Sequence, residues 1–239
     1  MRKKAKNNKA SWYSIKAAAN NQPAEVLLYD EIGFWGVTAA DFIADFNAIN
    51  DSNITLRINS PGGSVFEGMA IYNAIRRHKA TITTQIDGIA ASMASIIALA
   101  GDYIKMSETA YYMIHNPFGF SMGTAKDLRK DAQLLDEMTD QMVNIYQSKS
   151  TLSREEIIAA MDDETWYTGP TALTAGFVSE LTETLDAAAC YHGTDAVNHF
   201  TKSPITITQA TAQEDPPQPP KLTHLIAAKH DLLRLQDDI

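Results

Sequence analysis

The stretch from Leu56 to His115 constrains the fold most, because it alternates apolar β-type runs with two turns of small residues. The first turn is residues 59–64 (NSPGGS), and the second is residues 87–95 (DGIAASMAS). Each turn lies where an apolar run gives way to a helical pattern, so the first amides of each helix lack an intrahelical acceptor. Such helix starts favour negative charge through these amides and the helix dipole. The stretch predicts successive strand–turn–helix units and a parallel α/β sheet.

The remaining elements follow from the spacing of apolar residues and from helix-capping residues. Strands are predicted at 25–29, 54–58, 81–86, 103–106 and 110–114. Helices are predicted at 39–49, 65–77, 91–100, 125–148 and 154–161, with a short last helix near 170–176. The apolar stripe of the helix at 125–148 favours a core or subunit contact over a cofactor site.

Composition divides the chain into three parts. Residues 1–22 carry six basic side chains and no acid within the first twenty residues, and we expect them to be disordered. Residues 23–186 form the predicted catalytic domain. Residues 187–239 form an extension, with a proline-rich linker at 214–220 and an amphipathic helix after it.

Charge and hydropathy limit the classes of partner. The net charge is −9, so the chain beyond the basic head carries −15, which argues against nucleic acid as the main partner. No apolar run approaches the roughly 20 residues of a membrane span, so no membrane partner is expected. The single cysteine, Cys190, excludes an intrachain disulfide and fits a cytoplasmic location. The histidine spacing suggests no metal site.

Three features of the central stretch suggest acyl-transfer chemistry. Ser92 lies at a predicted helix start after small residues, where it could be a nucleophile or an ordinary N-cap. His115 ends a strand before an Asn-Pro step, where it could be a general base or a structural histidine. The amides of Gly63 and Met93 could form an oxyanion hole, although the Gly-Gly pair alone could also be a tight turn.

Taken together and in this order, the motifs resemble the Clp-type serine peptidase family. The resemblance is carried by INSPGGS at 58–64 with Gly68, by GIAASMA at 88–94, and by MIHNP at 113–117. It spans about residues 25–182 and implies a crotonase-like (ClpP-like) α/β fold, a ββα spiral with a protruding handle helix at 125–148. By resemblance, Ser92 is the nucleophile, His115 the general base, and the Gly63 and Met93 amides the oxyanion hole, with no cofactor.

The third member of the triad departs from the family pattern. By resemblance, Glu164 occupies the place of an aspartate in the family, ahead of Trp166. Glutamate is one methylene longer, so Asp163 remains an alternative, and Asp162 is a third nearby acid. Each of these acids could equally be a solvated turn charge.

The resemblance implies an intracellular serine endopeptidase that works inside a ring-shaped homo-oligomer, a heptamer or double heptamer. Peptides or unfolded proteins would be its substrates, and an AAA+ unfoldase or capsid proteins are candidate partners. The C-terminal extension resembles that of phage prohead maturation proteases. Two rivals remain: an acyl-CoA hydratase or isomerase of the same fold, and a catalytically inert assembly or scaffold subunit.

Overall fold

The computed structural model describes residues 13–16, 23–34, 36–183 and 200–204. These residues belong to one compact unit. Cys190, the linker at 214–220 and the amphipathic helix predicted after it lie outside the described residues.

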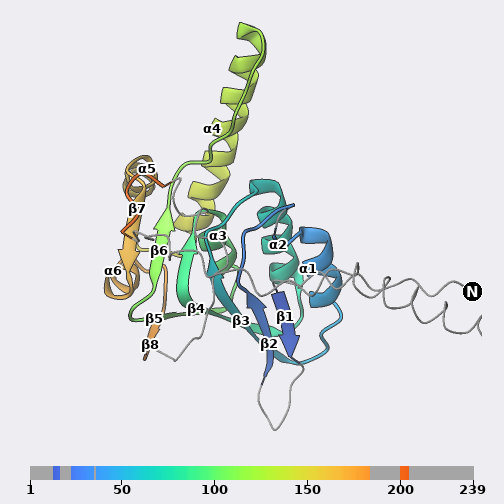
Figure 1. The fold of residues 1–239 in the computed structure, drawn as a ribbon. Helices are drawn as coiled ribbons and strands as arrows, with labels where there is room; N and C mark the ends of the chain where they lie inside the picture. The colour runs from blue at the N-terminus through green and yellow to red at the C-terminus, as the bar shows by residue number, and fades with distance from the viewer. Residues whose placement is uncertain (1–12, 17–22, 35, 184–199, 205–239) are drawn as a thin grey trace, which may run out of the picture. The chain divides into compact units, whose positions relative to one another are not determined.

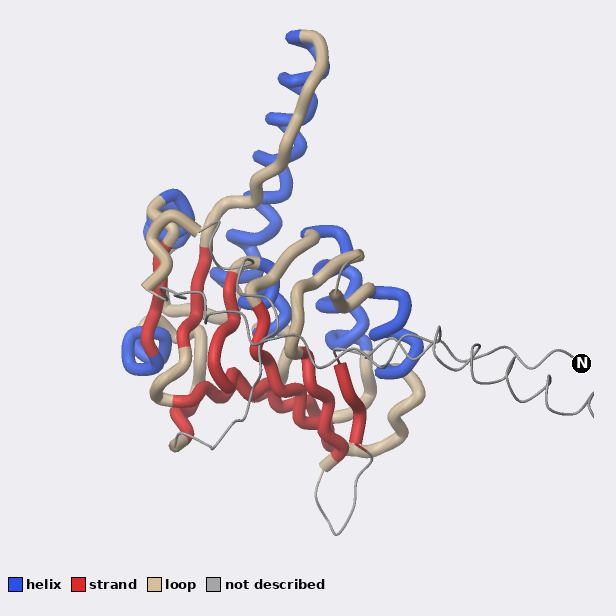
Figure 2. The backbone as a smooth tube through the Cα atoms, in the orientation of Figure 1, coloured by secondary structure: helices blue, strands red, loops and turns tan. Residues whose placement is uncertain are grey.

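A twisted sheet forms the centre of the fold (Figures 1 and 2). Its parallel part runs in the order β2 (Ala24–Leu28), β3 (Asn53–Ser60), β4 (Thr81–Ala91), β5 (Tyr103–Ser107) and β8 (Glu180–Thr182). Strand β1 (Tyr13–Lys16) extends this sheet by pairing antiparallel with β2. The parallel pairing of β2, β3, β4, β5 and β8 confirms the prediction of a parallel sheet.

Strand β4 changes partners along its length. Residues 83–86 pair with β5, whereas residues 89–91 pair in parallel with β6 (Tyr111–Ile114). Strand β6 in turn pairs antiparallel with β7 (Thr165–Thr168). The end of β4 and the end of β6 therefore lie side by side, which brings together the residues that follow each strand.

Helices α1 (Ala39–Phe46), α2 (Val65–Arg77) and α3 (Met93–Ala98) lie along one side of the sheet (Figure 1). Each begins at an N-cap residue, and the Thr38 and Ser64 side chains accept the amides of Asp41 and Glu67. All six residues of α3 are buried, because small and aliphatic side chains let it pack tightly between α2 and β4. This burial fixes the turn that precedes α3.

Helix α4 (Ala125–Gln147) projects beyond the sheet (Figure 1). Most of its residues are exposed, and its buried side chains, Met142, Val143 and Tyr146, all belong to its last two turns. Helix α5 (Arg154–Asp162) starts with the capping box predicted from Ser153 and Glu156. The short helix α6 (Gly169–Thr174) follows β7.

Three expectations need correction. Residues 13–16 form β1, so the expectation of disorder for 1–22 is wrong there: a short aromatic and β-branched run finds an edge strand to pair with. The second turn is shorter than predicted, because the strand pairing of β4 with β6 continues to Ala91. Phe200 is 5% exposed and packs against Trp166, so the packed unit does not end at 186.

Candidate active site

Ser92 occupies the single-residue turn between β4 and α3. Its backbone has φ 54° and ψ −125°, a left-handed conformation that is unusual for a residue with a side chain. The Ser92 amide donates to the Met113 carbonyl at 3.0 Å, which holds the turn against β6. Ser92 is the N-cap residue of α3 by position, but its side chain makes no capping hydrogen bond to the helix.

The hydroxyl of Ser92 meets the imidazole of His115. The distance between Ser92 Oγ and His115 Nε2 is 2.7 Å, which is hydrogen-bonding distance. This contact follows from strand register, because Ala91 pairs with Met113. Ser92 comes directly after Ala91, and His115 comes two residues after Met113. His115 is 9% exposed, and the rings of Phe118 and Phe200 lie 5.8 and 5.3 Å from its ring.

The Gly62–Gly63 turn lies against the turn that carries Ser92. Both glycines have positive φ, 92° and 140°. A Cβ atom at Gly62 would lie 2.6–2.8 Å from atoms of residues 91–93, so only glycine permits this approach. Ile32 holds the turn from the other side, donating to the Gly62 carbonyl and accepting from the Ser64 amide, both at 2.7 Å.

A cavity of about 510 Å³ opens over these groups. Its lining includes Ser92, His115 and both glycines, together with Glu31, Pro61, Ser64, Val65, Pro117 and Phe118. The amide of Met93, the first residue of α3, lacks an intrahelical acceptor by its position in the helix. The cleft thus joins a hydroxyl, an imidazole and a glycine-lined backbone, the groups that acyl transfer uses.

A buried network of hydrogen bonds holds the turn that carries Ser92. Ser95 Oγ donates to the Ser92 carbonyl at 2.5 Å and lies 2.7 Å from the Tyr146 hydroxyl. The Tyr112 hydroxyl donates to the Ser95 carbonyl at 3.0 Å. Burial raises the pKa of both tyrosines, so their hydroxyls remain protonated donors.

The three candidate acids lie at the end of α5 and in the turn after it, beside His115. Asp162, Asp163 and Glu164 line a second cavity of about 230 Å³ together with His115, Thr201 and Lys202. Asp162 accepts a hydrogen bond from Asn116 Nδ2 at 2.7 Å, and Asp163 forms an ion pair with Lys202.

Glu164 has a left-handed backbone, with φ 49°. Its carboxylate accepts hydrogen bonds from the amides of Thr201 and Lys202. Burial works to raise the pKa of Glu164, but these hydrogen bonds outweigh it and hold the pKa below its ordinary value. All three predicted acids therefore lie beside His115, and two of them hold a later segment of the chain.

Comparison with known proteins identifies the family that this fold and cleft belong to. Residues 8–184 match the family model described as Clp protease. The chain belongs to the Clp protease family. Its members are serine-type peptidases of crotonase-like α/β fold, so the predicted fold and enzyme class are confirmed.

Individual Clp relatives agree. The ATP-dependent Clp protease proteolytic subunit 1 of Leifsonia xyli subsp. xyli is 36% identical over 133 residues, which cover 55% of this chain and 68% of that protein. The ATP-dependent Clp protease proteolytic subunit of Bacteroides fragilis is 30% identical over 166 residues, or 65% and 80% of the two chains. The subunit of Porphyromonas gingivalis is 31% identical over 168 residues, or 66% and 76%.

The described part of this Clp-family chain holds no group of three or more His, Cys, Asp or Glu side chains arranged to bind a metal ion. No helix among the same residues combines the length and hydropathy needed to cross a membrane.

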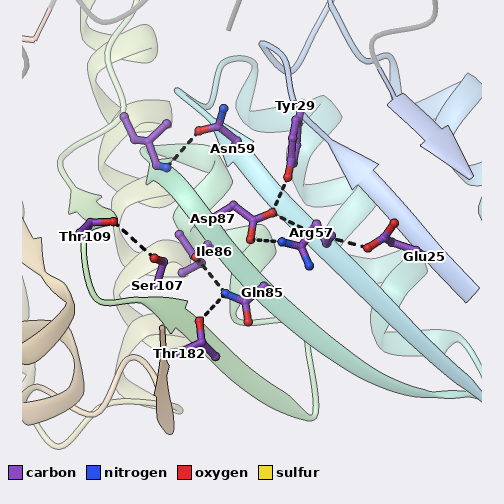
Figure 3. Close-up of polar contacts among 11 residues, drawn as sticks. Glu25, Tyr29, Arg57, Asn59, Gln85, Ile86, Asp87, Ser107, Thr109 and Thr182 are labelled. Carbon is purple, nitrogen blue, oxygen red and sulfur yellow. Dashed lines mark hydrogen bonds and ion pairs between the residues drawn. The ribbon is translucent and has the colours of Figure 1, made fainter. Parts of the chain in front are cut away.

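The sequence analysis missed a polar row on the sheet beside the site (Figure 3). Asp87 accepts from the Tyr29 hydroxyl and, through both oxygens, from Arg57 at 2.6 and 2.8 Å. Two residues further along each strand, Asn59 Oδ1 accepts the buried amide of Ile89 at 3.1 Å. The alternation of polar residues along 55–59 was the available signal, but it does not say which partners they meet.

Proposed function

We propose that this chain is a serine endopeptidase that hydrolyses peptide bonds through an acyl-enzyme on Ser92. The observation that carries the proposal is the 2.7 Å contact between Ser92 Oγ and His115 Nε2 inside the cleft. A serine hydroxyl is a weak nucleophile until a base removes its proton, and this imidazole is placed to do so. The family of the chain supports the same reaction class.

In this mechanism His115 Nε2 takes the hydroxyl proton as Ser92 Oγ attacks the scissile carbonyl carbon. The carbonyl oxygen becomes an oxyanion, and the amides of Gly63 and Met93 donate to it. The imidazolium then gives its proton to the leaving amine, and the C–N bond breaks. Water repeats the sequence on the ester and releases the acid. The chemistry needs no cofactor.

The amide of Gly63 suits this role because of its neighbours. The Gly62 carbonyl and the Ser64 amide both face Ile32, and alternation along an extended chain turns the Gly63 amide to the opposite side. A Cβ atom at Gly63 would lie 2.1 Å from the Ile32 carbonyl oxygen, so a substituted residue could not keep this position.

By resemblance, Glu164 is the first choice and Asp163 the alternative for the carboxylate that serves His115, either by direct contact with the imidazole or by positioning it through residues 201–202. A carboxylate beside the base fixes the imidazole tautomer and stabilises the imidazolium. Both carboxylates contact residues 201–202.

We propose further that the chain acts as a ring-shaped homo-oligomer, a heptamer or double heptamer, on peptides or unfolded proteins. The support is an exposed apolar loop before α4, in which Phe118, Phe120 and Met122 are 69%, 94% and 87% exposed. Exposed apolar patches of this kind usually mark interfaces. A monomeric mass by light scattering at micromolar concentration would contradict this assembly.

An AAA+ unfoldase is a proposed partner by family. The narrower role of capsid maturation rests on resemblance alone, and cleavage of a capsid protein by the purified chain would test it.

Labelling with a fluorophosphonate probe, followed by mass spectrometry, tests the mechanism. We expect one adduct, on Ser92, and loss of both labelling and peptide cleavage in Ser92→Ala, with oligomer size unchanged. Loss of the nucleophile should lower kcat by several orders of magnitude. Near-normal turnover by Ser92→Ala would refute the mechanism, and an assembled particle that never labels would favour the inert scaffold.

A further inference from the structure

Residues 200–202, which we call the clasp, lie beyond the predicted catalytic domain yet contact its site. We propose that the clasp holds the imidazole of His115 in its catalytic orientation, and that Glu164 acts on catalysis by anchoring the clasp. Phe200 and Glu164 are then positioning residues. The inference rests on the proposed role of His115 as general base.

The Glu164 carboxylate holds the clasp by accepting charge-assisted hydrogen bonds from its backbone amides. One oxygen of the Glu164 carboxylate accepts from the Thr201 amide and hydroxyl, both at 3.0 Å, and the other accepts from the Lys202 amide at 2.6 Å. Hydrogen bonds to an ionised acceptor are about twice as strong as neutral ones. Glu164 makes them from a left-handed backbone, which persists only where the surroundings hold it.

The anchored clasp presents Phe200 to the base. The Phe200 ring meets the His115 ring edge-on, with centroids 5.3 Å apart and planes at 84°. It meets the Trp166 ring in the same way, at 5.6 Å and 79°. Phe200 is 5% exposed, so its contacts with the His115 and Trp166 rings are part of the buried packing. Edge-to-face geometry at these distances is favourable for aromatic pairs.

His115 is thereby held between two rings, Phe200 and Phe118. Phe118 is 69% exposed and belongs to a loop, whereas Phe200 is buried, so Phe200 restrains the His115 ring more strongly. The 2.7 Å contact to Ser92 Oγ depends on the direction of Nε2, and therefore on the rotation of the ring. Removing the Phe200 ring lets the His115 ring turn away from the Ser92 hydroxyl.

The ion pair between Lys202 and Asp163 contributes less to the clasp. Their side chains are 52% and 72% exposed, and exposed pairs add little stability. The clasp therefore depends mainly on Glu164 and on the burial of Phe200.

Steady-state kinetics on a short fluorogenic peptide test the proposal in the full-length chain, with Phe200→Ala, Glu164→Gln and the double variant. We expect each single change to lower kcat about tenfold to hundredfold, as for a misplaced catalytic group, while KM changes less than about twofold. The rate of fluorophosphonate labelling should fall in parallel. The double variant should lose no more than the worse single variant, because both changes release the same contact.

Matched controls are Phe66→Ala and Glu155→Gln, the same substitutions at exposed positions at the starts of α2 and α5. Both should keep kcat within about twofold, as surface changes usually do. If Phe200→Ala fails to assemble, Phe200→Leu replaces it, since leucine keeps buried apolar volume but removes the ring edge. The same fall in kcat is expected, and wild-type turnover would overturn the proposal.

The other outcomes are distinct. Unchanged or higher kcat in Phe200→Ala would overturn the proposal, and a higher value would mean that the clasp obstructs the site. Losses that multiply in the double variant would overturn the proposal, because Glu164 would then act on catalysis independently of the clasp. A wild-type chain that neither labels nor cleaves would refute the proposed function itself, whereas a labelled wild type with an unaffected Phe200→Ala would refute the clasp alone.

Discussion

Asn59→Leu removes the acceptor that holds an irregularity in β4 just before the serine turn. Ile58 pairs with Ile86, but Ser60 pairs with Ala90, so β4 has two more residues than β3 in this interval. Asn59 Oδ1 fills the gap and accepts the Ile89 amide at 3.1 Å (Figure 3). Leucine has nearly the same shape as asparagine but accepts no hydrogen bond.

The magnitude follows from burial. Asn59 is 6% exposed and its bond to Ile89 is buried, so the amide would lose its acceptor away from water. An unsatisfied buried donor costs about 1–3 kcal/mol in free energy of unfolding. At about 2–4 °C per kcal/mol for a domain of this size, Asn59→Leu should lower Tm by about 2–12 °C. A looser β4 also displaces Ser92 from Gly62, so kcat should fall about tenfold or more.

Calorimetry and peptide kinetics measure the two effects separately. Thr55→Val is the matched control, since it changes a half-buried polar residue of the same strand and face, and it should stay within about 0.5 kcal/mol of wild type. An unchanged Tm in Asn59→Leu would refute the energetic argument. A lowered Tm with unchanged kcat would show that the irregularity does not position Ser92.

Three further predictions concern regions around the site. Burial, and then the hydrogen bond to Asp87, raise the pKa of Tyr29 from 10.0 to about 12; the neutral phenol therefore stabilises the fold below pH 10, and that stabilisation is lost as pH rises to 12. Urea unfolding should show a smaller loss of stability in Tyr29→Phe than in wild type, because Tyr112 and Tyr146, whose pKa values are also raised by burial, still contribute to it. Glu31 is the one acidic residue among the described residues that line the 510 Å³ cavity, so peptides with lysine beside the scissile bond should have a lower KM than those with glutamate, by up to about fivefold. Glu31→Gln should abolish that difference. Deleting 214–239 leaves the clasp in place and should leave short-peptide turnover unchanged, and an inactive or unfolded product would contradict the domain boundaries.

Most elements could be predicted because local signals agreed with the fold. The helix at 65–77 has the predicted bounds, since a serine cap and basic residues in its last turn mark both ends. The capping box at Ser153 likewise marks the start of α5. The end of β4 could not be predicted, because its small residues resemble a turn and only pairing with β6 makes them a strand. Strand β1 was missed because four residues within a basic segment carry little pattern of their own.

The site divides in the same way. Ser92, His115 and the glycine pair could be chosen from sequence because each ends a strand of a parallel sheet, and strand ends meet at one edge. The neighbours of the acids could not be chosen, because Glu164 meets Thr201 and Lys202 across a long separation in sequence. Phe200 carried no signal at all: one aromatic residue without periodicity predicts nothing until its partners are known.

The close approach of Gly62 to residues 91–93 has a consequence for how this enzyme can change by mutation. The two turns are 30 residues apart in sequence, yet any side chain at 62 would overlap the Ala91 carbonyl, the Met93 amide and the Ser92 Cβ at once. Shifting one neighbour would leave two overlaps, so no single compensating substitution could restore the fit. When every amino acid is tried at position 62, only glycine should give an active enzyme. No single substitution elsewhere in the chain should restore activity to a variant with another residue at 62.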